Sequence, residues 1–574
     1  MSNDLGSGSL GVRVHPWRHR LLVLMVAFLS QGSFAAAAAD YDQAIRELSA
    51  AAEAEVREGR ISGTTIALID NQQIVFARGF GFADKKRRIP ARPDTIYRAG
   101  SISKLFTAVA AMQLVEQGKV DLDAPITKYL PSFNVIVPFE NAKPITLRQL
   151  MCHRSGMVRE APVGGYFDDS EPGMDKTVAS LASCVLTYPP ATRTKYSNSG
   201  VTIVGKVVEQ VSRTPFPLYQ QKRVFAPLGM SSSGFLRNTQ IRRKLATGYL
   251  PVANDAGGFR EMDAPVFEFG ILAAGNLYTT AEDLGRFISF LFAEGRAGGQ
   301  QLLRSDTLNE MFTPQLTSDT NGFGLGFSIG HFRGRKTVNH MGAVYGFTSI
   351  LTAIPSEKIG VVVLCNDDVA LGPVRRLNAT ALGLMLSAKT GETVTTAPSS
   401  SMASDRLRDF AGGYESQSYW AQIDMKGPGI IADISGQKLA LTPTGALKFE
   451  ANGRVAYNAP FVFERDTNGK IIGFTAFEQK FHRIDPASVP AAPESWKPLL
   501  GAYGPAFIPL IISVKFGHLY AMTENEFDYR LTPLNGSVFQ MPPGMYEGEQ
   551  IVFQPNRHSK VHRIVFANMP LRRR

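Results

Sequence analysis

Cysteine is scarce in this sequence of 574 residues, which contains only Cys152, Cys184 and Cys365. So few and so scattered thiols exclude a disulfide-held scaffold. One bridge between Cys152 and Cys184 is possible in an oxidising compartment, and buried free thiols are the default expectation. Hydrophobic residues make up 44% and charged residues 19% of the chain, so the sequence can bury a large core without disulfides.

Paired metal ligands are also lacking. None of the nine histidines falls in a His-Glu-x-x-His or similar spacing, so zinc chemistry has no support and we expect no metal or organic cofactor. The formal net charge is +11, but no zinc-finger, helix-turn-helix or aromatic RNA-binding motif accompanies it, so nucleic acid is not an expected partner. Basic runs at 85–88 and 572–574 could favour an anionic polymer, although a solvated surface explains them more simply.

Long apolar runs are missing except near the start of the sequence. There a basic stretch precedes the apolar run Leu21–Leu29 and the small residues Ala35–Ala39, the layout of a secretory signal cleaved before Asp40. The alternative is an uncleaved anchor, since this stretch could just cross a bilayer of about 30 Å. In either case we expect a periplasmic or secreted protein that meets a membrane only through an uncleaved signal.

The first two thirds of the chain mix strand and helix patterns. Two hairpins are predicted at 64–77 and 348–364, and helices at 41–58, 101–117 and 374–389. Apolar residues at helical spacing define the second helix, and Gly118 supplies its C-terminal cap. Strands at both ends with helices between them predict an α+β domain built around an antiparallel sheet.

Composition changes near residue 400. The stretch 390–404 is small, polar and proline-containing, as in a linker, and short strands with frequent turns follow it. A weak repeat pairs Phe410–Tyr414 with Leu500–Tyr503, Gly436–Leu439 with Gly517–Tyr520, and His482–Ile484 with His562–Ile564. It predicts two small antiparallel β-barrel or sandwich domains. The expected divisions are a signal at 1–39, the α+β domain at 40–395, and β domains at 396–487 and 488–574.

Ser101 and Lys104 are three residues apart where the predicted second helix begins, so both lie on one face of its first turn. A serine hydroxyl becomes a good nucleophile when a neighbouring base takes its proton, and an amine can do so if burial or nearby cations lower its pKa. The helix N-terminus also offers backbone N–H groups to a developing oxyanion. A second such pair, Ser435 and Lys438, falls in a predicted β-turn, and we interpret it as a decoy.

Two further elements complete the candidate site. Tyr196 and Asn198 precede an apolar helix that starts near Val201; the tyrosine can share proton transfer, and the amide can hold Lys104 and the substrate carbonyl. His340-Met-Gly342 lies just before the hairpin at 348–364. There Gly342 would let substrate approach the strand, and the Ala343 N–H could be a second oxyanion donor.

These three elements, in this order, resemble the penicillin-recognising serine hydrolases: class C β-lactamases, D-alanyl-D-alanine carboxypeptidases, D-aminopeptidases and related esterases. The resemblance covers about residues 41–390 and extends to stretches at 146–156, 225–230, 274–283 and 324–327. It implies a β-lactamase/transpeptidase-like fold. It also implies roles for the site: Ser101 as nucleophile, Lys104 and Tyr196 in proton transfer, Asn198 as polar support, and the N–H groups of Ser101 and Ala343 as the oxyanion hole.

One departure from that family affects the expected substrate. Where β-lactamases usually carry Lys-Thr-Gly, this sequence has His340-Met-Gly342, and histidine is less reliably cationic at neutral pH. Recognition of a substrate carboxylate is therefore weakened, which favours peptidase, amidase or esterase activity over strong penicillinase activity. The two β domains are similar in arrangement to those of D-aminopeptidases, where they flank the active site.

The leading hypothesis is an exported serine hydrolase that forms an acyl-enzyme at Ser101. Its substrates would be small molecules or peptides, with D-amino-acid compounds or peptidoglycan-derived fragments first, then simple esters, then β-lactams. The alternative is a scaffold or sensor of the same fold that binds cell-wall ligands, either without catalysis or with slow deacylation. The intact set of Ser101, Lys104 and Tyr196 favours the enzyme.

Overall fold

The computed structural model describes residues 39–253, 259–393, 402–556 and 561–574. The expected signal, apart from Ala39, and the expected boundary between residues 395 and 396 lie outside these ranges. In the part of the chain that is described, no helix combines the length and the apolar character needed to cross a membrane. All three cysteines are buried free thiols, so the bridge considered for Cys152 and Cys184 is not formed.

An eight-stranded antiparallel sheet forms the centre of the α+β part, in the order β10-β11-β12-β13-β14-β1-β2-β3. Its strands are β1 Gly63–Asp70, β2 Gln73–Asp84, β3 Ile89–Pro90, β10 Gly322–Phe323, β11 Ser328–Phe332, β12 Arg335–Val344, β13 Phe347–Ile354 and β14 Ile359–Cys365. Both predicted hairpins are present, as β1–β2 and β13–β14. Pairing of β1 with β14 joins them in the middle of the sheet, and β12 lies next to β13.

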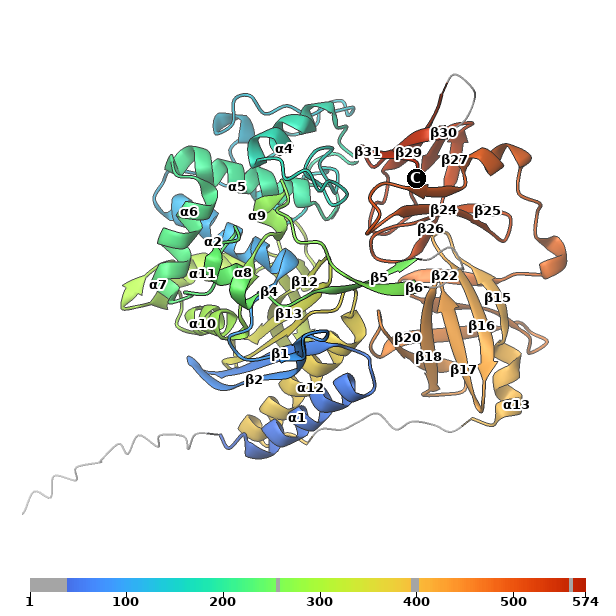
Figure 1. The fold of residues 1–574 in the computed structure, drawn as a ribbon, viewed down its shortest axis with the longest axis horizontal. Helices are drawn as coiled ribbons and strands as arrows, with labels where there is room; N and C mark the ends of the chain where they lie inside the picture. Colours follow the sequence, from blue (N-terminus) through green and yellow to red (C-terminus); the bar gives the residue numbers. More distant parts are fainter. Residues whose placement is uncertain (1–38, 254–258, 394–401, 557–560) are drawn as a thin grey trace, which may run out of the picture. The chain divides into compact units, whose positions relative to one another are not determined.

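Helices cover both faces of this sheet (Figure 1). α1 Asp42–Arg57 and α12 Leu371–Thr390 pack together on one face, and α10 Ala281–Phe292 packs against β1, β2 and β14 on the other. α2 Ser103–Glu116 packs against α5 Asn198–Ser212 and α9 Leu272–Gly275. Nearly every side chain of α2 is buried, as expected for a helix that is apolar on all sides.

The remaining elements of this part are short. Its other helices are α3 Leu147–Met151, α4 Met174–Ser180, α6 Phe216–Gln220, α7 Ala226–Leu228, α8 Thr239–Lys244 and α11 Ser305–Met311. Three two-stranded pairs are β4 Tyr97–Arg98 with β7 Tyr278–Thr279, β5 Tyr249–Ala253 with β6 Phe259–Asp263, and β8 Arg296–Ala297 with β9 Gln300–Gln301. The architecture is the predicted α+β arrangement around an antiparallel sheet.

A closed eight-stranded barrel follows, after α13 Ser404–Leu407. Its strands are β15 Gly412–Glu415, β16 Trp420–Lys426, β17 Gly429–Ile434, β18 Gln437–Pro443, β19 Lys448–Gly453, β20 Ala459–Arg465, β21 Ile471–Ala476 and β22 Gln479–Arg483. Along β18 buried and exposed residues alternate, because successive side chains of a strand point to opposite faces. Closure through β15 and β22 leaves no open sheet edge.

Residues 501–572 form a second β unit made of a four-stranded and a five-stranded sheet. The first contains β23 Gly501–Tyr503, β24 Leu510–Lys515, β25 His518–Met522 and β26 Asp528–Arg530, and the second contains β27 Thr532–Asn535, β28 Val538–Gln540, β29 Gln550–Pro555, β30 Val561–Phe566 and β31 Met569–Arg572. The short helical turn Pro486–Ser488 contains the expected boundary between residues 487 and 488.

The two β units share the contacts at which the sequence repeat begins. Tyr414 donates its hydroxyl proton to the carbonyl of Phe410 at 2.7 Å, and Tyr503 donates to the carbonyl of Leu499 at 2.8 Å. The guanidinium of Arg483 donates to the carbonyls of residues 409 and 411, and that of Arg573 donates to those of residues 498 and 500. The repeat therefore reflects a common structure.

Two of the three predicted repeat pairs are out of register. Arg483 corresponds to Arg573 by its contacts, whereas the sequence comparison paired it with Arg563 of β30. Gly517 forms the turn between β24 and β25, which corresponds to the turn at Gly427 between β16 and β17 and not to the one at Gly436. Glycine turns recur at successive hairpins with left-handed φ, so short motifs could be matched to the wrong strand.

Candidate active site

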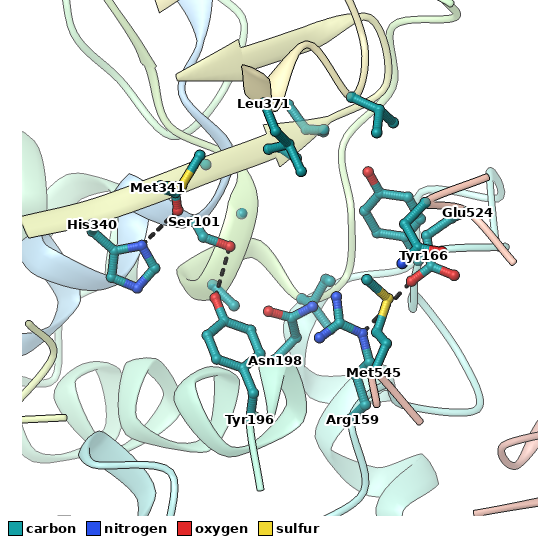
Figure 2. A pocket seen from close by; sticks show the side chains of 18 of the residues that line it. Ser101, Arg159, Tyr166, Tyr196, Asn198, His340, Met341, Leu371, Glu524 and Met545 are labelled. Atoms are coloured by element: carbon teal, nitrogen blue, oxygen red, sulfur yellow. Dashed lines mark hydrogen bonds and ion pairs between the residues drawn. The ribbon is translucent and has the colours of Figure 1, made fainter. Parts of the chain in front are cut away.

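Ser101 lies in a tight turn that leads into α2. The predicted helix begins at Ser103, and Ser101 belongs to the 3₁₀ turn Gly100–Ile102 before it. The buried Ser103 fixes this turn, because its hydroxyl donates to the Gly100 carbonyl at 2.6 Å and accepts the Leu277 N–H at 2.9 Å. Ser101 remains partly exposed and faces the pocket in Figure 2.

Lys104 is one turn further along and is fully enclosed. Its Nζ donates to Ser101 Oγ at 2.9 Å, to Asn198 Oδ1 at 2.7 Å and to the carbonyl of Ala274 at 2.8 Å. Burial lowers the pKa of Lys104 far below its usual range, and the Arg159 charge lowers it further against the opposing effect of Glu160. A neutral amine would keep two donated hydrogen bonds and could accept the Ser101 proton through its lone pair.

Tyr196 and Asn198 reach the same serine from the start of α5. The Ser197 side chain caps this helix by accepting the Gly200 N–H at 2.8 Å, as serine does at many helix starts. The Tyr196 hydroxyl donates to Ser101 Oγ at 2.9 Å, and Figure 2 shows the two side chains pointing toward each other. Burial raises the pKa of Tyr196 to about 12, so its hydroxyl is neutral at ordinary pH.

Two rings hold the tyrosine in place. His153 packs on Tyr196 with ring centroids 4.2 Å apart, and Phe323 packs edge-on against His153. Burial lowers the pKa of His153 far below its usual range, and its Nδ1 accepts the backbone N–H of Ser197 at 3.2 Å. His153 therefore acts as a neutral packing residue that orients the segment containing Tyr196.

His340 lies on β12 beside these residues. Burial, with a smaller effect from Lys104, lowers its pKa to about 3, so the ring is neutral at physiological pH. Its Nδ1–H donates to the carbonyl of Met341 at 2.6 Å, while Nε2 is buried without a hydrogen-bond partner among the described residues. His340 therefore supplies no cation where a lysine would.

Gly342 and Ala343 follow on the same strand. A Cβ on Gly342 would lie 2.0 Å from the carbonyl oxygen of Ala99 and 2.5 Å from Ser349 Oγ. Glycine is therefore needed for close packing of β12 against the turn that carries Ser101, a requirement that the sequence did not reveal and that is separate from the expected role in substrate approach. A Cβ on Gly100 would lie 2.9 Å from the Ala343 nitrogen, so the strand backbone passes directly beside the same turn.

The pocket above Ser101 has a volume of about 500 Å³. All the predicted site residues except Lys104 line it; Lys104 contacts Ser101 from below. Most of its other walls are apolar or aromatic side chains from the α+β part, and the second β unit adds Glu524, Asn525, Phe527 and Met545. No motif in the sequence identified these four residues, because they are too distant from Ser101 in the chain to belong to a shared pattern.

A buried group of charges next to the pocket was also missed. The Nε atom of Arg159 lies 3.6 Å from Glu160 Oε1 and 3.6 Å from Glu524 Oε1, and Tyr546 donates to Glu524 Oε1 at 2.8 Å. Figure 2 shows Arg159 and Glu524 on the side of Asn198 away from His340. Arg159 and Glu160 stand three and four residues after the end of the family-like stretch 146–156, and this proximity was the one signal available in the sequence.

Other predicted features are placed as follows. Ser435 is buried in the turn between β17 and β18, where its Oγ accepts the Trp420 N–H, and Lys438 is exposed on β18. The predicted turn is confirmed for Ser435, whereas Lys438 lies on the strand that follows it. Across the described ranges, no three His, Cys, Asp or Glu side chains are grouped as metal ligands.

Comparisons with known proteins confirm the expected β-lactamase/transpeptidase-like fold. Protein Rv1367c of Mycobacterium tuberculosis is 27% identical over 316 residues, which is 48% of this chain and 78% of that protein. The penicillin-binding protein homologue from Pyrococcus abyssi superposes with a TM-score of 0.55 at 24% identity, covering 76% of this chain and 99% of that one. The D-amino acid amidase from Ochrobactrum anthropi gives 0.51 at 23% identity, covering 60% and 99%.

The two structures share the fold of this chain at low sequence identity. The beta-lactamase family model matches residues 42–384, which contain the predicted site from Ser101 to Ala343 and end within α12. The chain therefore belongs to the beta-lactamase family.

Proposed function

We propose that this protein is a serine hydrolase that transfers the acyl part of an amide or ester to Ser101 and then to water. One observation carries the proposal: Ser101 Oγ receives hydrogen bonds from both Lys104 Nζ and Tyr196 OH, each at 2.9 Å, at the base of a pocket. A hydroxyl held between an amine of lowered pKa and a phenol is arranged for proton removal and return.

Acylation would begin with the neutral Lys104 amine accepting the Ser101 proton as Oγ attacks the substrate carbonyl. The N–H groups of Ser101 and Ala343 would stabilise the resulting oxyanion. The Tyr196 hydroxyl would pass a proton to the leaving amine or alcohol. Tyr196 would then regain a proton from Lys104, which restores the neutral amine. In the second half, this amine would take a proton from the water that attacks the acyl-enzyme, and Tyr196 would return a proton to Ser101 Oγ as the bond to the acyl group breaks.

The pocket is suited to bind uncharged or apolar acyl groups. Its walls are mainly aromatic and aliphatic, and His340 carries no charge at neutral pH. We therefore propose D-amino-acid amides or peptides and small esters as substrates, peptidoglycan fragments among them, with β-lactams last. The structural neighbour that is a D-amino acid amidase supports amides as the first class to screen. Secretion or a periplasmic location is part of this proposal and rests on the sequence at 1–39.

Labelling with a fluorophosphonate, which reacts with activated serines, tests the function. Wild type is expected to gain one adduct by mass, Ser101→Ala none, and Ser435→Ala the same adduct as wild type. A folded wild type that takes no adduct would contradict the proposal and favour a ligand-binding scaffold. An adduct-forming protein whose substrate-derived acyl-enzyme persists for hours would favour the slowly deacylating sensor, because the same residues would then acylate without turnover.

A further inference from the structure

Glu160 is a fully buried carboxylate connected to the proposed base. Its Oε1 accepts a hydrogen bond from Asn198 Nδ2 at 2.5 Å, and Asn198 Oδ1 accepts one from Lys104 Nζ at 2.7 Å. A continuous chain of hydrogen bonds therefore runs from Glu160 to the amine beside Ser101. The second oxygen, Oε2, has no hydrogen-bond partner among the described residues.

This chain determines which way the Asn198 amide points. An ionised carboxylate only accepts hydrogen bonds, so the NH₂ group of Asn198 must face Glu160 and its oxygen must face Lys104. The reverse orientation would place two oxygens together on one side and two nitrogen donors together on the other. Without the carboxylate, no group on that side would favour the orientation in which Asn198 Oδ1 accepts a hydrogen bond from Lys104 Nζ.

Several charged and titratable side chains surround Glu160 and act on its pKa. Burial raises its pKa to about 7; Arg159 opposes this, Glu524 adds to it, and Asn198 and Lys104 oppose it. The other titratable neighbours are the phenols of Tyr166, Tyr196, Tyr345 and Tyr546, whose pKa values burial raises so that they are neutral. The negative charge of Glu160 raises the pKa of Lys104, whereas the positive charge of Arg159 lowers it.

We propose that Glu160 is a positioning residue of the active site, which fixes the Asn198 amide and, through its negative charge, sets the pH above which Lys104 is the neutral base. The inference rests on the function proposed above. Glu524 acts through Glu160: it stands in the turn between β25 and β26 and shares Arg159 with it at 3.6 Å. Through this contact the second β unit would influence the pH at which the hydrolase site works.

The test is the pH dependence of fluorophosphonate labelling in the full chain. Glu160→Gln keeps an acceptor for Asn198 but removes the charge, so the protonated form of Lys104 loses support. We expect the midpoint of the labelling rate to move down by about one pH unit, which makes labelling about fivefold faster one unit below the wild-type midpoint. The rate at high pH should stay close to that of wild type, since the hydrogen bonds remain.

Two further variants separate charge from structural damage. Glu524→Gln removes a like charge beside Glu160, so Glu160 stays ionised to lower pH. The midpoint of the labelling rate should therefore move up. This variant also tests the inference if Glu160→Gln does not fold. Glu547→Gln is the matched control: this carboxylate pairs with Arg193 at 2.7 Å and not with Glu160 or Lys104. Its profile should match that of wild type.

The outcomes are distinct. Opposite shifts in the two variants, with Glu547→Gln unchanged, support the inference. If wild type is labelled and the pH profiles of Glu160→Gln and Glu524→Gln coincide with its profile, the inference about Glu160 is overturned and the proposed function still stands. A folded wild type that never reacts overturns both.

Discussion

Lys195 and Glu549 form an ion pair that is almost sealed from solvent. Their side chains are 4% and 2% exposed, and Nζ lies 2.7 Å from Oε1. The same oxygen accepts the backbone N–H of Arg159 at 3.0 Å. Lys195→Met would leave the Glu549 carboxylate buried without a cation. We expect it to lower the free energy of unfolding by about 3–5 kcal/mol, the usual cost of breaking a buried pair from one side.

A double variant tests whether the unpaired charge causes that loss. Lys195→Met with Glu549→Leu puts two apolar side chains in the same space, a change that is often neutral for a buried pair. The Arg159 N–H would lose its acceptor, at a cost of about 1–3 kcal/mol. The double variant should therefore be more stable than Lys195→Met alone, although less stable than wild type.

Urea unfolding is followed by two signals. Trp420 and Trp496 lie in or beside the two β units, so fluorescence reports on these units, and far-ultraviolet circular dichroism reports mainly on the helices of the α+β part. The two transitions need not coincide in a chain of this size, and both should move to lower urea in Lys195→Met. A single variant as stable as wild type, or a double variant no better than the single one, would refute the reasoning.

Two other predictions concern β12. Because the pKa of His340 is about 3 when folded and 6.5 when free, the unfolded chain takes up a proton below pH 6.5 that the folded protein does not. Wild type should therefore lose stability relative to His340→Gln by about 1.4 kcal/mol per pH unit from pH 6.5 toward 3. Thermal unfolding at pH 7 and pH 5 measures the stability difference between the two proteins, and an equal difference at both pH values would contradict this prediction. Gly342→Ala should lower stability by about 1–3 kcal/mol and slow labelling of Ser101, because its Cβ would collide with the Ala99 carbonyl. Gly330→Ala, whose Cβ would have no neighbour closer than 3.3 Å, is the control, and equal melting temperatures for the two variants would argue against a packing role.

The sequence was informative wherever chemistry coincided with a local structural signal. Ser101 and Lys104 are close because one turn of chain separates them, and Tyr196 and Asn198 stand at a helix start marked by the cap Ser197. Hairpins and helices of the α+β part followed from periodicity in the same way. The sequence could not show that α5 and α2 would bring these groups within 3 Å of one another; the family resemblance supplied that expectation.

What the sequence could not predict depends on contacts across the chain. Glu160 and Glu524 belong to no motif. Glu160 matters because folding places it beside Asn198, and Glu524 matters because folding places it beside Arg159. The packing requirement at Gly342 was missed for a related reason, since Ala99, which faces the position of its missing side chain, is on another element. The register of the β repeat failed because its short turn motifs are common to many hairpins, whereas the paired tyrosine and arginine contacts appear only in three dimensions.

The hydrogen bond between Arg159 and Glu549 joins residues 390 positions apart, and this separation has a consequence in time. Chains fold in order as they are synthesised, and N-terminal domains form first. The α+β part can therefore collapse around Ser101 before Glu524, Met545 and Glu549 have been added. During that interval the nucleophile stands in a cleft with one wall missing, and this wall is completed only when the second β unit docks.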